Sequence, residues 1–458
     1  MIQRTLREIE KMAGGSGMQP DVGAIGIKGV SIDTRTIQKG NLYVPLKGER
    51  FDGHDYAHKA IENGASALLW QKDVPNPPAG IPVIFVEDTY HGLQQLAKSY
   101  RDSLSVKVIG VTGSNGKTST KDILTSLLSM RYKVQKTEGN YNNHIGLPLT
   151  LLRLEEDTEI AVLEMGMSNF GEIEFLSRLA TPDAAIITNI GESHMMELGS
   201  RAGIAQAKLE IITGLREEGI FAYNGDEPLL RERVREIRLP AKVVTFGQDS
   251  TNDLYPLSVQ LGENGTVFTV NADPSVEFFL PVLGKHNVYN SLACMAVAHF
   301  FNVTWEEMKD GLRQLKMTGM RMEVVKSSSG LTVINDAYNA SPTSMKAAIA
   351  LINELRGYEK KIVVLGDMLE LGGEEEAFHY EIGEMLDPAH IDYVFTYGNL
   401  GTHIARGART SFAPDKVKMY LDKEELAKDL KCVVTEHDVV LVKASRGMKL
   451  EEVIDWIK

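Results

Sequence analysis

The chain has 458 residues, 43% hydrophobic and 24% charged, which is typical of a globular protein with two or three domains. Its 49 basic and 62 acidic residues give a net charge of −13, which argues against nucleic-acid binding through a basic surface. The two cysteines, Cys294 and Cys432, exclude a disulfide framework or a cysteine-rich zinc site. No apolar run reaches the roughly 18 residues of a membrane span. Residues 1–17 lack a signal-peptide core, so we expect a cytoplasmic protein without membrane insertion.

Strand-like and helical patterns alternate along the chain. Residues 1–103 combine short strand-like runs at 41–45 and 81–86 with helical patterns at 58–63 and 92–100. An apolar run then enters a glycine-rich turn and a helical segment, which opens a second unit. The later alternation is typical of parallel α/β sheets, and it resumes in the last third of the chain. Strands are expected at 106–111, 160–163, 184–188, 220–223, 243–246, 332–334, 362–365, 393–396 and 439–442, and helices at 118–130, 287–301 and 450–456.

The sharpest local signal is the stretch GVTGSNGKTS at 110–119, between an apolar strand and a helix. Glycines let backbone N–H groups approach phosphate oxygens, and the helix N-terminus favours anions. A lysine adds a positive charge, and the hydroxyl that follows it can bind Mg²⁺. The common phosphate-loop pattern needs glycine at 111, where this chain has valine, so the match is to the shorter T-G-x-N-G-K-T form. Phosphate binding is assigned to Gly113, Ser114, Asn115, Gly116, Lys117, Thr118 and Ser119.

The bound nucleotide is expected to be ATP, because no guanine-reading N-K-x-D sequence occurs in the chain.

The loop T-G-S-N-G-K-T resembles that of the Mur ligases, the ATP-dependent amide-forming enzymes of peptidoglycan precursor synthesis. Further segments agree with this family in order and spacing over essentially the whole chain. They lie at 164–166, 189–194, 207–210, 284–290, 320–323, 335–342 and 443–446.

The resemblance implies a three-domain α/β fold. We expect a small N-terminal UDP-substrate-binding domain (1–103), a central parallel-sheet ATP-binding domain (104–318) and a C-terminal Rossmann-like domain (319–458). It also implies the reaction: a substrate carboxylate attacks the γ-phosphate of ATP, and an amine then displaces phosphate from the resulting acyl phosphate. ADP and phosphate are the products.

Two regions narrow the expected substrates. Residues 31–35 and 46–54 resemble the later-acting family members, which hold the UDP end of the precursor there. The segment LGDMLELG at 365–372 resembles the member that adds D-alanyl-D-alanine to UDP-N-acetylmuramoyl-tripeptide. The D-N-P-R motif of the dibasic-amino-acid-adding member is absent. The expected substrates are therefore UDP-N-acetylmuramoyl-tripeptide and D-alanyl-D-alanine. We expect the protein to be a monomer.

The resemblance also assigns roles to single residues. Without it, Glu164 would be a solvated strand-end carboxylate and Lys208 an exposed helix residue. With it, the catalytic set is Lys117, Lys208, His194, Arg321 and Lys443. Two Mg²⁺ ions are implied, held by Thr118, Glu164, His194 and a carbamylated Lys208. Further ATP contacts are Asn290 at the adenine, Asp336 and Tyr338 at the ribose and base, and Arg321. Substrate contacts are Ser31, Asp33, Arg35, Thr137, Asn140 and Asn143 for the UDP-sugar end, and Ser445 and Arg446 for the incoming dipeptide or the phosphate.

Three alternatives stay open at this point. One is the dibasic-amino-acid-adding ligase. The second is folylpolyglutamate synthase, which shares the phosphate loop but would lack the N-terminal UDP-type domain. The third is a regulatory or scaffold protein that uses ATP as a conformational switch. Both lysine and diaminopimelate are compatible with the sequence as the third residue of the tripeptide.

Overall fold

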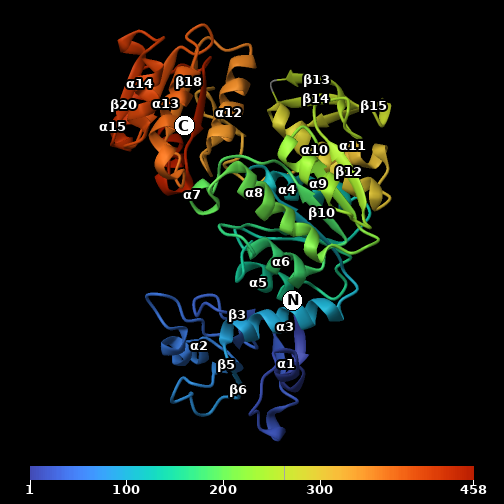
Figure 1. Cartoon of the computed structure of the whole chain (residues 1–458). Helices are drawn as coiled ribbons and strands as arrows, with labels where there is room; N and C mark the ends of the chain where they lie inside the picture. Colours follow the sequence, from blue (N-terminus) through green and yellow to red (C-terminus); the bar gives the residue numbers. More distant parts are fainter. Residues whose placement is uncertain (263) are drawn as a thin grey trace.

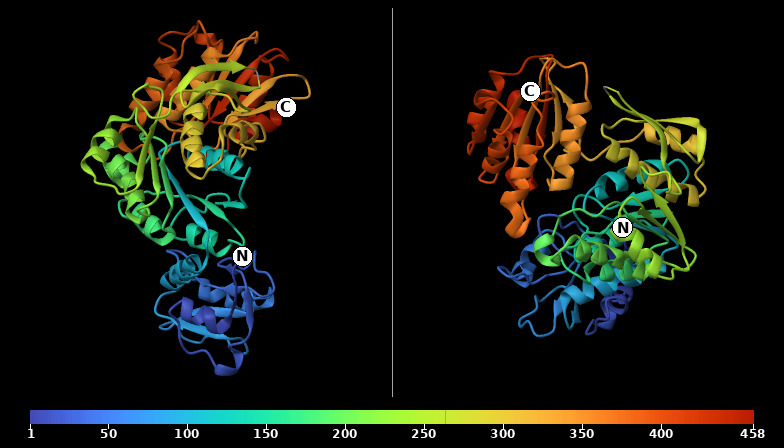
Figure 2. Two further views of the ribbon diagram at one scale, coloured as in Figure 1. Left: turned by 90° about the vertical axis from the view of Figure 1, so that its right-hand side faces the viewer. Right: turned by 45° about the horizontal axis from the view of Figure 1, so that its top comes forward.

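Apolar strand segments along the chain assemble into sheets that belong to three α/β units, arranged one after another (Figure 1). The computed structural model describes residues 1–262 and 264–458. The N-terminal and C-terminal units lie at opposite ends of an elongated molecule, with the central unit between them (Figure 2). Within the described residues, no helix has the length and apolar character needed to cross a membrane. The three-domain α/β fold expected from the sequence is confirmed.

The N-terminal unit contains a small parallel sheet in the order β3-β4-β5-β6 and an antiparallel pair, β1-β2. Thr5 begins the first helix with a capping box, since its side chain and that of Glu8 each accept a backbone N–H of the other residue. The elements are β1 (Gln3–Thr5), α1 (Leu6–Met12), η1 (Pro20–Val22), β2 (Gly26–Lys28), β3 (Val30–Ser31), β4 (Leu42–Tyr43), η2 (Gly53–Tyr56), α2 (Ala57–Glu62), β5 (Ala67–Gln71), β6 (Val83–Val86) and α3 (Thr89–Ser103).

The central unit is built on a six-stranded parallel sheet in the order β12-β11-β10-β7-β9-β8. An antiparallel three-stranded sheet, β13-β14-β15, follows it. The strands are β7 (Lys107–Thr112), β8 (Val134–Lys136), β9 (Ile160–Glu164), β10 (Ala184–Ile187), β11 (Ile220–Asn224), β12 (Lys242–Phe246), β13 (Pro256–Gly262), β14 (Gly265–Val270) and β15 (Asp273–Leu280). The helices are α4 (Lys117–Leu128), α5 (Gly146–Leu152), α6 (Glu172–Ala180), α7 (Met195–Leu198), α8 (Arg201–Leu209), η3 (Glu210–Gly214), α9 (Pro228–Glu236), α10 (Lys285–Phe300) and α11 (Trp305–Arg313).

The C-terminal unit has a second six-stranded sheet, in the order β16-β17-β21-β18-β19-β20, in which β16 alone runs antiparallel to its neighbour. Its strands are β16 (Glu323–Lys326), β17 (Thr332–Asp336), β18 (Lys361–Gly366), β19 (Tyr393–Tyr397), β20 (Val417–Tyr420) and β21 (Val439–Lys443). Its helices are α12 (Pro342–Glu354), η4 (Gly372–Glu374), α13 (Glu375–Glu384), α14 (Gly401–Ala408), η5 (Pro414–Lys416), α15 (Lys423–Lys431), η6 (Arg446–Met448) and α16 (Glu451–Ile457).

The N-terminal and central units share one apolar core. The helix α3 packs against α5 and α6, and a single cluster of buried side chains includes residues of both units. Two side chains of α3 add hydrogen bonds across the junction. The Tyr100 hydroxyl donates to the Leu154 carbonyl at 2.9 Å, and the buried Arg101 Nε donates to the Ala180 carbonyl at 2.9 Å. The burial of apolar side chains at this junction stabilises the packing of the two units against each other.

Candidate active site

The phosphate loop connects β7 to α4 and takes a conformation that requires glycine at two positions. Gly113 has φ +152° and Gly116 has φ +82°. A Cβ atom at Gly113 would lie 1.8 Å from Thr188 Oγ1, and one at Gly116 would lie 2.8 Å from Asn290 Oδ1. The close approach of Asn290 places the N-terminus of α10 beside that of α4. Backbone strain and crowding therefore both exclude larger residues at these positions.

Side chains that follow β10 fix the loop in place. The Asn115 backbone N–H donates to Asn189 Oδ1 at 2.9 Å, and the Asn115 carbonyl accepts from Asn189 Nδ2 and from the Thr188 hydroxyl. The Gly191 N–H donates to Ser114 Oγ at 2.9 Å. The carboxyl ends of β7 and β10, which are neighbours in the sheet, thus build one rigid rim.

Lys117, the first residue of α4, folds back over this loop. Its Nζ donates to the Gly113 carbonyl at 2.7 Å. Burial lowers the pKa of the amine from its ordinary value, and the positive charge of Arg321 lowers it further, whereas Glu164 acts in the opposite direction. An ammonium group at the start of a helix, beside glycine-supplied backbone N–H groups, is suited to hold phosphate oxygens.

Glu164 ends β9 and is 4% exposed. One of its carboxylate oxygens accepts from the Thr118 hydroxyl at 3.0 Å, and the other accepts from Asn142 Nδ2 at 3.0 Å. Its backbone N–H donates to Thr137 Oγ1, also at 3.0 Å. The carboxylate is thereby aimed at the N-terminus of α4, at the carboxyl end of a parallel strand.

Lys208 and His194 lie close enough to Lys117 for its charge to act on both. Lys208 is only 2% exposed, so it is not the exposed helix residue that its helix alone would suggest. Burial lowers the pKa of its amine well below the ordinary value, and the charge of Lys117 adds to the effect. Burial, followed by the charges of Lys208 and Lys117, also lowers the pKa of His194 to about 4. At neutral pH the imidazole is uncharged and able to act as a metal ligand.

The C-terminal unit contributes a second group of charged residues. Lys443, at the end of β21, is buried and donates both to an Asp336 carboxylate oxygen and to the Asn339 carbonyl. Arg321 stacks over Tyr338, with its guanidinium carbon 4.2 Å from the ring centre. The Arg321 Nε is buried, and the described residues offer it no hydrogen-bond acceptor. A buried, unused guanidinium donor facing a cavity is suited to an anionic ligand.

The phosphate loop, Glu164 and the charged residues of the C-terminal unit line one cavity between the central and C-terminal units, whereas Lys208 and His194 are not among its lining residues. All the predicted nucleotide contacts line it except Gly113, whose carbonyl accepts from Lys117. The two units also touch at its edge, where Ser341 Oγ donates to Asn115 Oδ1 at 3.1 Å and Thr343 Oγ1 donates to Glu192 at 2.6 Å. The lining residues are Ser114, Asn115, Gly116, Lys117, Thr118, Ser119, Glu164, Asn290, Arg321, Asp336, Tyr338 and Lys443, together with Thr188, Asn189, Asn224, His286, Asn287, Tyr289, Met322, Asn339, Thr343, Ser344 and Ala347, which were not predicted.

A second cleft opens next to this cavity and shares Ser114, Lys117 and Asn339 with it. The predicted contacts His194, Ser445 and Arg446 line it, together with residues 369–371 of the segment 365–372 that the sequence singled out. The central unit supplies His194 just before α7, and the C-terminal unit supplies the other groups. The first cavity can therefore hold a nucleotide. The second cleft can admit another polar molecule beside the phosphate groups of that nucleotide.

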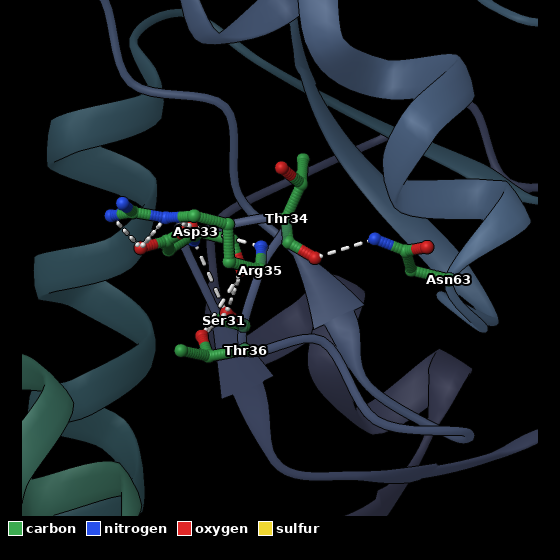
Figure 3. Close-up of polar contacts among 6 residues, drawn as sticks. All are labelled: Ser31, Asp33, Thr34, Arg35, Thr36 and Asn63. Carbon is green, nitrogen blue, oxygen red and sulfur yellow. Dashed lines mark hydrogen bonds and ion pairs between the residues drawn. The ribbon is translucent and has the colours of Figure 1, made fainter.

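The predicted UDP contacts of the N-terminal unit form a loop of their own (Figure 3). The Asp33 carboxylate accepts from the Arg35 backbone N–H and from the Arg35 guanidinium, the shortest contact being 2.7 Å. These hydrogen bonds lower the pKa of Asp33 below its ordinary value. The Ser31 hydroxyl lies within hydrogen-bond distance of the Asp33 carbonyl and of the Thr36 hydroxyl, whereas the Arg35 side chain is 87% exposed. The loop is ordered internally and presents its cation to solvent.

The three residues predicted for the UDP-sugar channel have different surroundings. Thr137 is fully buried and accepts from the Glu164 N–H, whereas Asn140 is exposed. Asn143 accepts two backbone N–H groups at the start of α5. Asn142, which contacts Glu164 directly, was not singled out in the sequence. An irregular loop carries no periodicity that distinguishes one asparagine from the next.

A parallel sheet whose phosphate loop faces a cavity rich in cations and carboxylates, closed by a second α/β unit, defines a nucleotide-dependent enzyme of the phosphate-loop class. Three sequence families match the chain: the Mur ligase middle domain over residues 111–298, the Mur ligase glutamate ligase domain over 320–446, and the Mur ligase family catalytic domain over 26–101. The chain belongs to the Mur ligase family.

Relatives along the full length of the chain agree with this assignment. The UDP-N-acetylmuramoyl-tripeptide--D-alanyl-D-alanine ligase of Bacillus subtilis (strain 168) is 54% identical over 454 residues, covering 99% of this chain and 98% of that protein. The crystal structure of MurF from Acinetobacter baumannii has a TM-score of 0.89 at 29% identity, covering 100% of this chain and 99% of the other. The MurF ligase of Thermotoga maritima in complex with ADP has a TM-score of 0.83 at 32% identity, covering 94% and 97% of the two chains.

Proposed function

We propose that this chain joins D-alanyl-D-alanine to the terminal carboxylate of UDP-N-acetylmuramoyl-tripeptide and cleaves ATP to ADP and phosphate. The convergence of the phosphate loop, Glu164, Arg321 and Lys443 on one cavity carries the proposal on the structural side. The full-length relative at 54% identity bears the name of this activity, and the Thermotoga relative was solved with ADP. The product is a precursor of peptidoglycan.

The reaction has two steps. A carboxylate oxygen of the tripeptide forms a bond to the γ-phosphorus of ATP while the bond to the β-phosphate oxygen breaks, which releases ADP. The dipeptide ammonium then loses one proton to solvent, and its nitrogen bonds to the acyl carbon as the carbon–oxygen bond to phosphate breaks. The leaving phosphate takes the second proton, and the amide keeps the third. Negative charge is concentrated in both steps, so fixed cations lower the barrier.

Lys117, Arg321 and Lys443 supply these cations. Lys117 lies on the phosphate loop and lines both the nucleotide cavity and the second cleft, which suits it to the transferring phosphate. Arg321 has a free buried donor and stacks on Tyr338, so its guanidinium is held in place before any substrate arrives. Asp336 anchors Lys443, and Asn290 with Tyr338 would contact the base and ribose. Preorganised charges of this kind need no rearrangement during the reaction.

Two Mg²⁺ ions would complete the site by neutralising phosphate charge and activating the γ-phosphate. The Thr118 hydroxyl and the Glu164 carboxylate are hard oxygen ligands at the start of α4, and His194 offers a neutral nitrogen. Among the described residues no group of three His, Cys, Asp or Glu side chains could hold a metal by itself. In proteins, Mg²⁺ commonly binds through one or two carboxylates together with substrate phosphates and water.

Lys208 would supply a further metal ligand as a carbamate. The amine is buried, its pKa is depressed, and the charged neighbour that acts on it is another cation. A neutral amine reacts with CO₂, and the product is an anion with two hard oxygens, which favours Mg²⁺ where an ammonium would repel it.

The N-terminal unit would hold the UDP end of the precursor through Ser31, Asp33 and Arg35, with Thr137, Asn140 and Asn143 toward the sugar. The exposed, Asp33-ordered guanidinium of Arg35 supports this assignment, because guanidinium groups bind phosphate oxygens in pairs. Ser445 and Arg446 would contact the incoming dipeptide or the phosphate. We also propose that the protein is a monomer and that it works in the cytoplasm, where reducing conditions suit its two free thiols.

Phosphate release tests the proposed activity. Wild-type protein with ATP and Mg²⁺ should release phosphate only when UDP-muramoyl tripeptide and D-alanyl-D-alanine are both present, and lysine or diaminopimelate should not replace the dipeptide. Faster turnover with a UDP-muramoyl dipeptide and a dibasic amino acid would identify the dibasic-adding ligase instead. ATP hydrolysis that neither substrate stimulates would favour a nucleotide-dependent switch. Tripeptides that end in lysine and in diaminopimelate, compared side by side, establish the preferred precursor.

A further inference from the structure

The segment between β18 and η4 presents one carboxylate to the second cleft. Glu370, in this segment, has φ +66°, a left-handed backbone conformation that side chains with a Cβ rarely adopt. Its side chain is 70% exposed, and a carboxylate oxygen lies 3.7 Å from His194 Nδ1 of the central unit. Such strain persists only where the surrounding structure imposes it, and it is commonly found at functional sites.

The neighbours of Glu370 are fixed from two sides. The Met368 N–H donates to Nε2 of the buried His379 at 2.8 Å, and the Leu369 N–H donates to Ser445 Oγ at 2.9 Å. The other ring nitrogen of His379 lies 2.6 Å from the Glu375 carbonyl, which orients the imidazole. α13 and the end of β21 therefore determine where Glu370 points, although its carboxylate is exposed.

The second cleft is lined by side chains of both charge signs. Among the described residues that line it, Glu370 is the carboxylate, and Lys117 and Arg446 are the cations. The cleft is formed jointly by the two units, because α7 of the central unit contacts η4, which follows Glu370 in the chain. In Figure 1, α7 lies next to the C-terminal unit. Its shared wall with the nucleotide cavity, formed by Ser114, Lys117 and Asn339, places it next to the phosphate loop.

We propose that Glu370 binds the α-ammonium group of the incoming dipeptide and thereby selects a zwitterionic acceptor. This inference rests on the proposed function. A dipeptide carries an ammonium at one end and a carboxylate at the other, and the cleft offers a carboxylate on Glu370 and the guanidinium of Arg446, one nitrogen of which is paired with Glu451. The nitrogen of this ammonium group is the atom that must reach the acyl phosphate. Glu370 would hold it where the C-terminal unit meets His194 of the central unit. An uncharged amine gains nothing from this contact.

The variant Glu370→Gln tests the inference, because glutamine keeps the size and backbone preference of glutamate and removes only the charge. We expect the KM for D-alanyl-D-alanine to rise at least tenfold, and the KM values for ATP and UDP-muramoyl tripeptide to stay within twofold. Glu370→Asp, which keeps the charge, should lie between the variant and wild type. Glu374→Gln, which removes an exposed carboxylate four residues further along, serves as the matched control.

A second nucleophile separates dipeptide recognition from acyl-phosphate formation. Hydroxylamine is uncharged at neutral pH and converts an acyl phosphate to a hydroxamate by attack of its nitrogen, with phosphate as the leaving group. With ATP and tripeptide present, the ratio of hydroxamate formation to dipeptide coupling should rise at least tenfold in Glu370→Gln relative to Glu374→Gln. A KM for the dipeptide equal to that of the control would overturn the inference. A parallel loss of both products would also overturn it, since Glu370 would then act on the first step.

The same assay separates the two proposals. Wild-type protein that forms neither amide nor hydroxamate from tripeptide and ATP would refute the proposed function, and the role of Glu370 with it. Wild-type protein that forms both, combined with a Glu370→Gln variant that couples the dipeptide normally, would refute the role of Glu370 alone.

Discussion

Replacing Thr137 with valine tests what holds Glu164 in place. The Thr137 side chain is fully buried, and its oxygen accepts the Glu164 N–H at 3.0 Å. Valine has nearly the same shape but no acceptor, so the substitution leaves one buried backbone donor unsatisfied. Such a loss typically costs roughly 1–3 kcal/mol of folding free energy. For a unit of this size, each kcal/mol lowers the unfolding midpoint by roughly 2–4 °C.

The functional consequence should fall on the nucleotide side of the reaction. Glu164 contacts Thr118 at the start of α4, so a displaced carboxylate should raise the concentrations of Mg²⁺ and ATP needed for half-maximal turnover. Thermal unfolding followed by circular dichroism, and phosphate release over a range of Mg²⁺ concentrations, measure the two effects. Thr137→Ser is the matched control, since it keeps the oxygen and removes one methyl group, worth about 0.8 kcal/mol of burial.

The opposite pattern would refute this reasoning. A valine variant with an unchanged unfolding midpoint, unchanged Mg²⁺ dependence and a raised KM for the UDP-precursor alone would show that Thr137 contacts the substrate. Substrate contact is the role that the family resemblance implies for Thr137. The experiment therefore decides whether Thr137 positions Glu164 or lines the substrate channel.

Three further outcomes are expected. Lys117→Ala should lower kcat on the order of 10²-fold with an unchanged unfolding midpoint, and normal turnover would mean that the loop is not the catalytic phosphate site. Lys208→Ala should lose most activity and recover part of it when a small carboxylic acid is added in excess. Lys208→Arg should stay inactive, because guanidinium cannot form a carbamate. An unmodified Lys208 amine in the mass spectrum of active enzyme would contradict the carbamate. Burial lowers the pKa of His379 in the folded state, so the unfolded state takes up the proton first and stability should fall as the pH drops below about 6.5. Thermal unfolding from pH 7.5 to 5 should show a shallower decline for His379→Gln, and equal slopes would count against the assignment.

Strong local patterns made much of the fold predictable. The apolar runs that became β7, β9, β10 and β11 are buried along their length, so hydrophobicity alone identified them. The sheet β13-β14-β15 was not predicted, because β13 is largely exposed and lacks an apolar face that is easily recognised. The edge strands β16 and β20 are only four residues long and were missed for a similar reason.

The candidate site divides in the same way. The phosphate loop could be predicted because the residues that bind phosphate are consecutive in the sequence. Glu370 and His379 could not, because their roles depend on a strained backbone and on contacts between β18, α13 and β21 that spacing does not reveal. The burial of Lys208 was equally hidden, since an alanine-rich helix gives no sign of which unit will cover it.

The apolar core shared by α3, α5 and α6 has a consequence for the length of the substrate. Arg35 belongs to the N-terminal unit and Lys117 to the central unit, and the shared core leaves the spacing between their loops little freedom to adjust. Under the proposed function, a precursor held at the loop of Arg35 would have to extend to Lys117 with its terminal carboxylate. We therefore expect the length of the peptide to contribute to substrate selection, because the shared core limits how far the two loops can move apart.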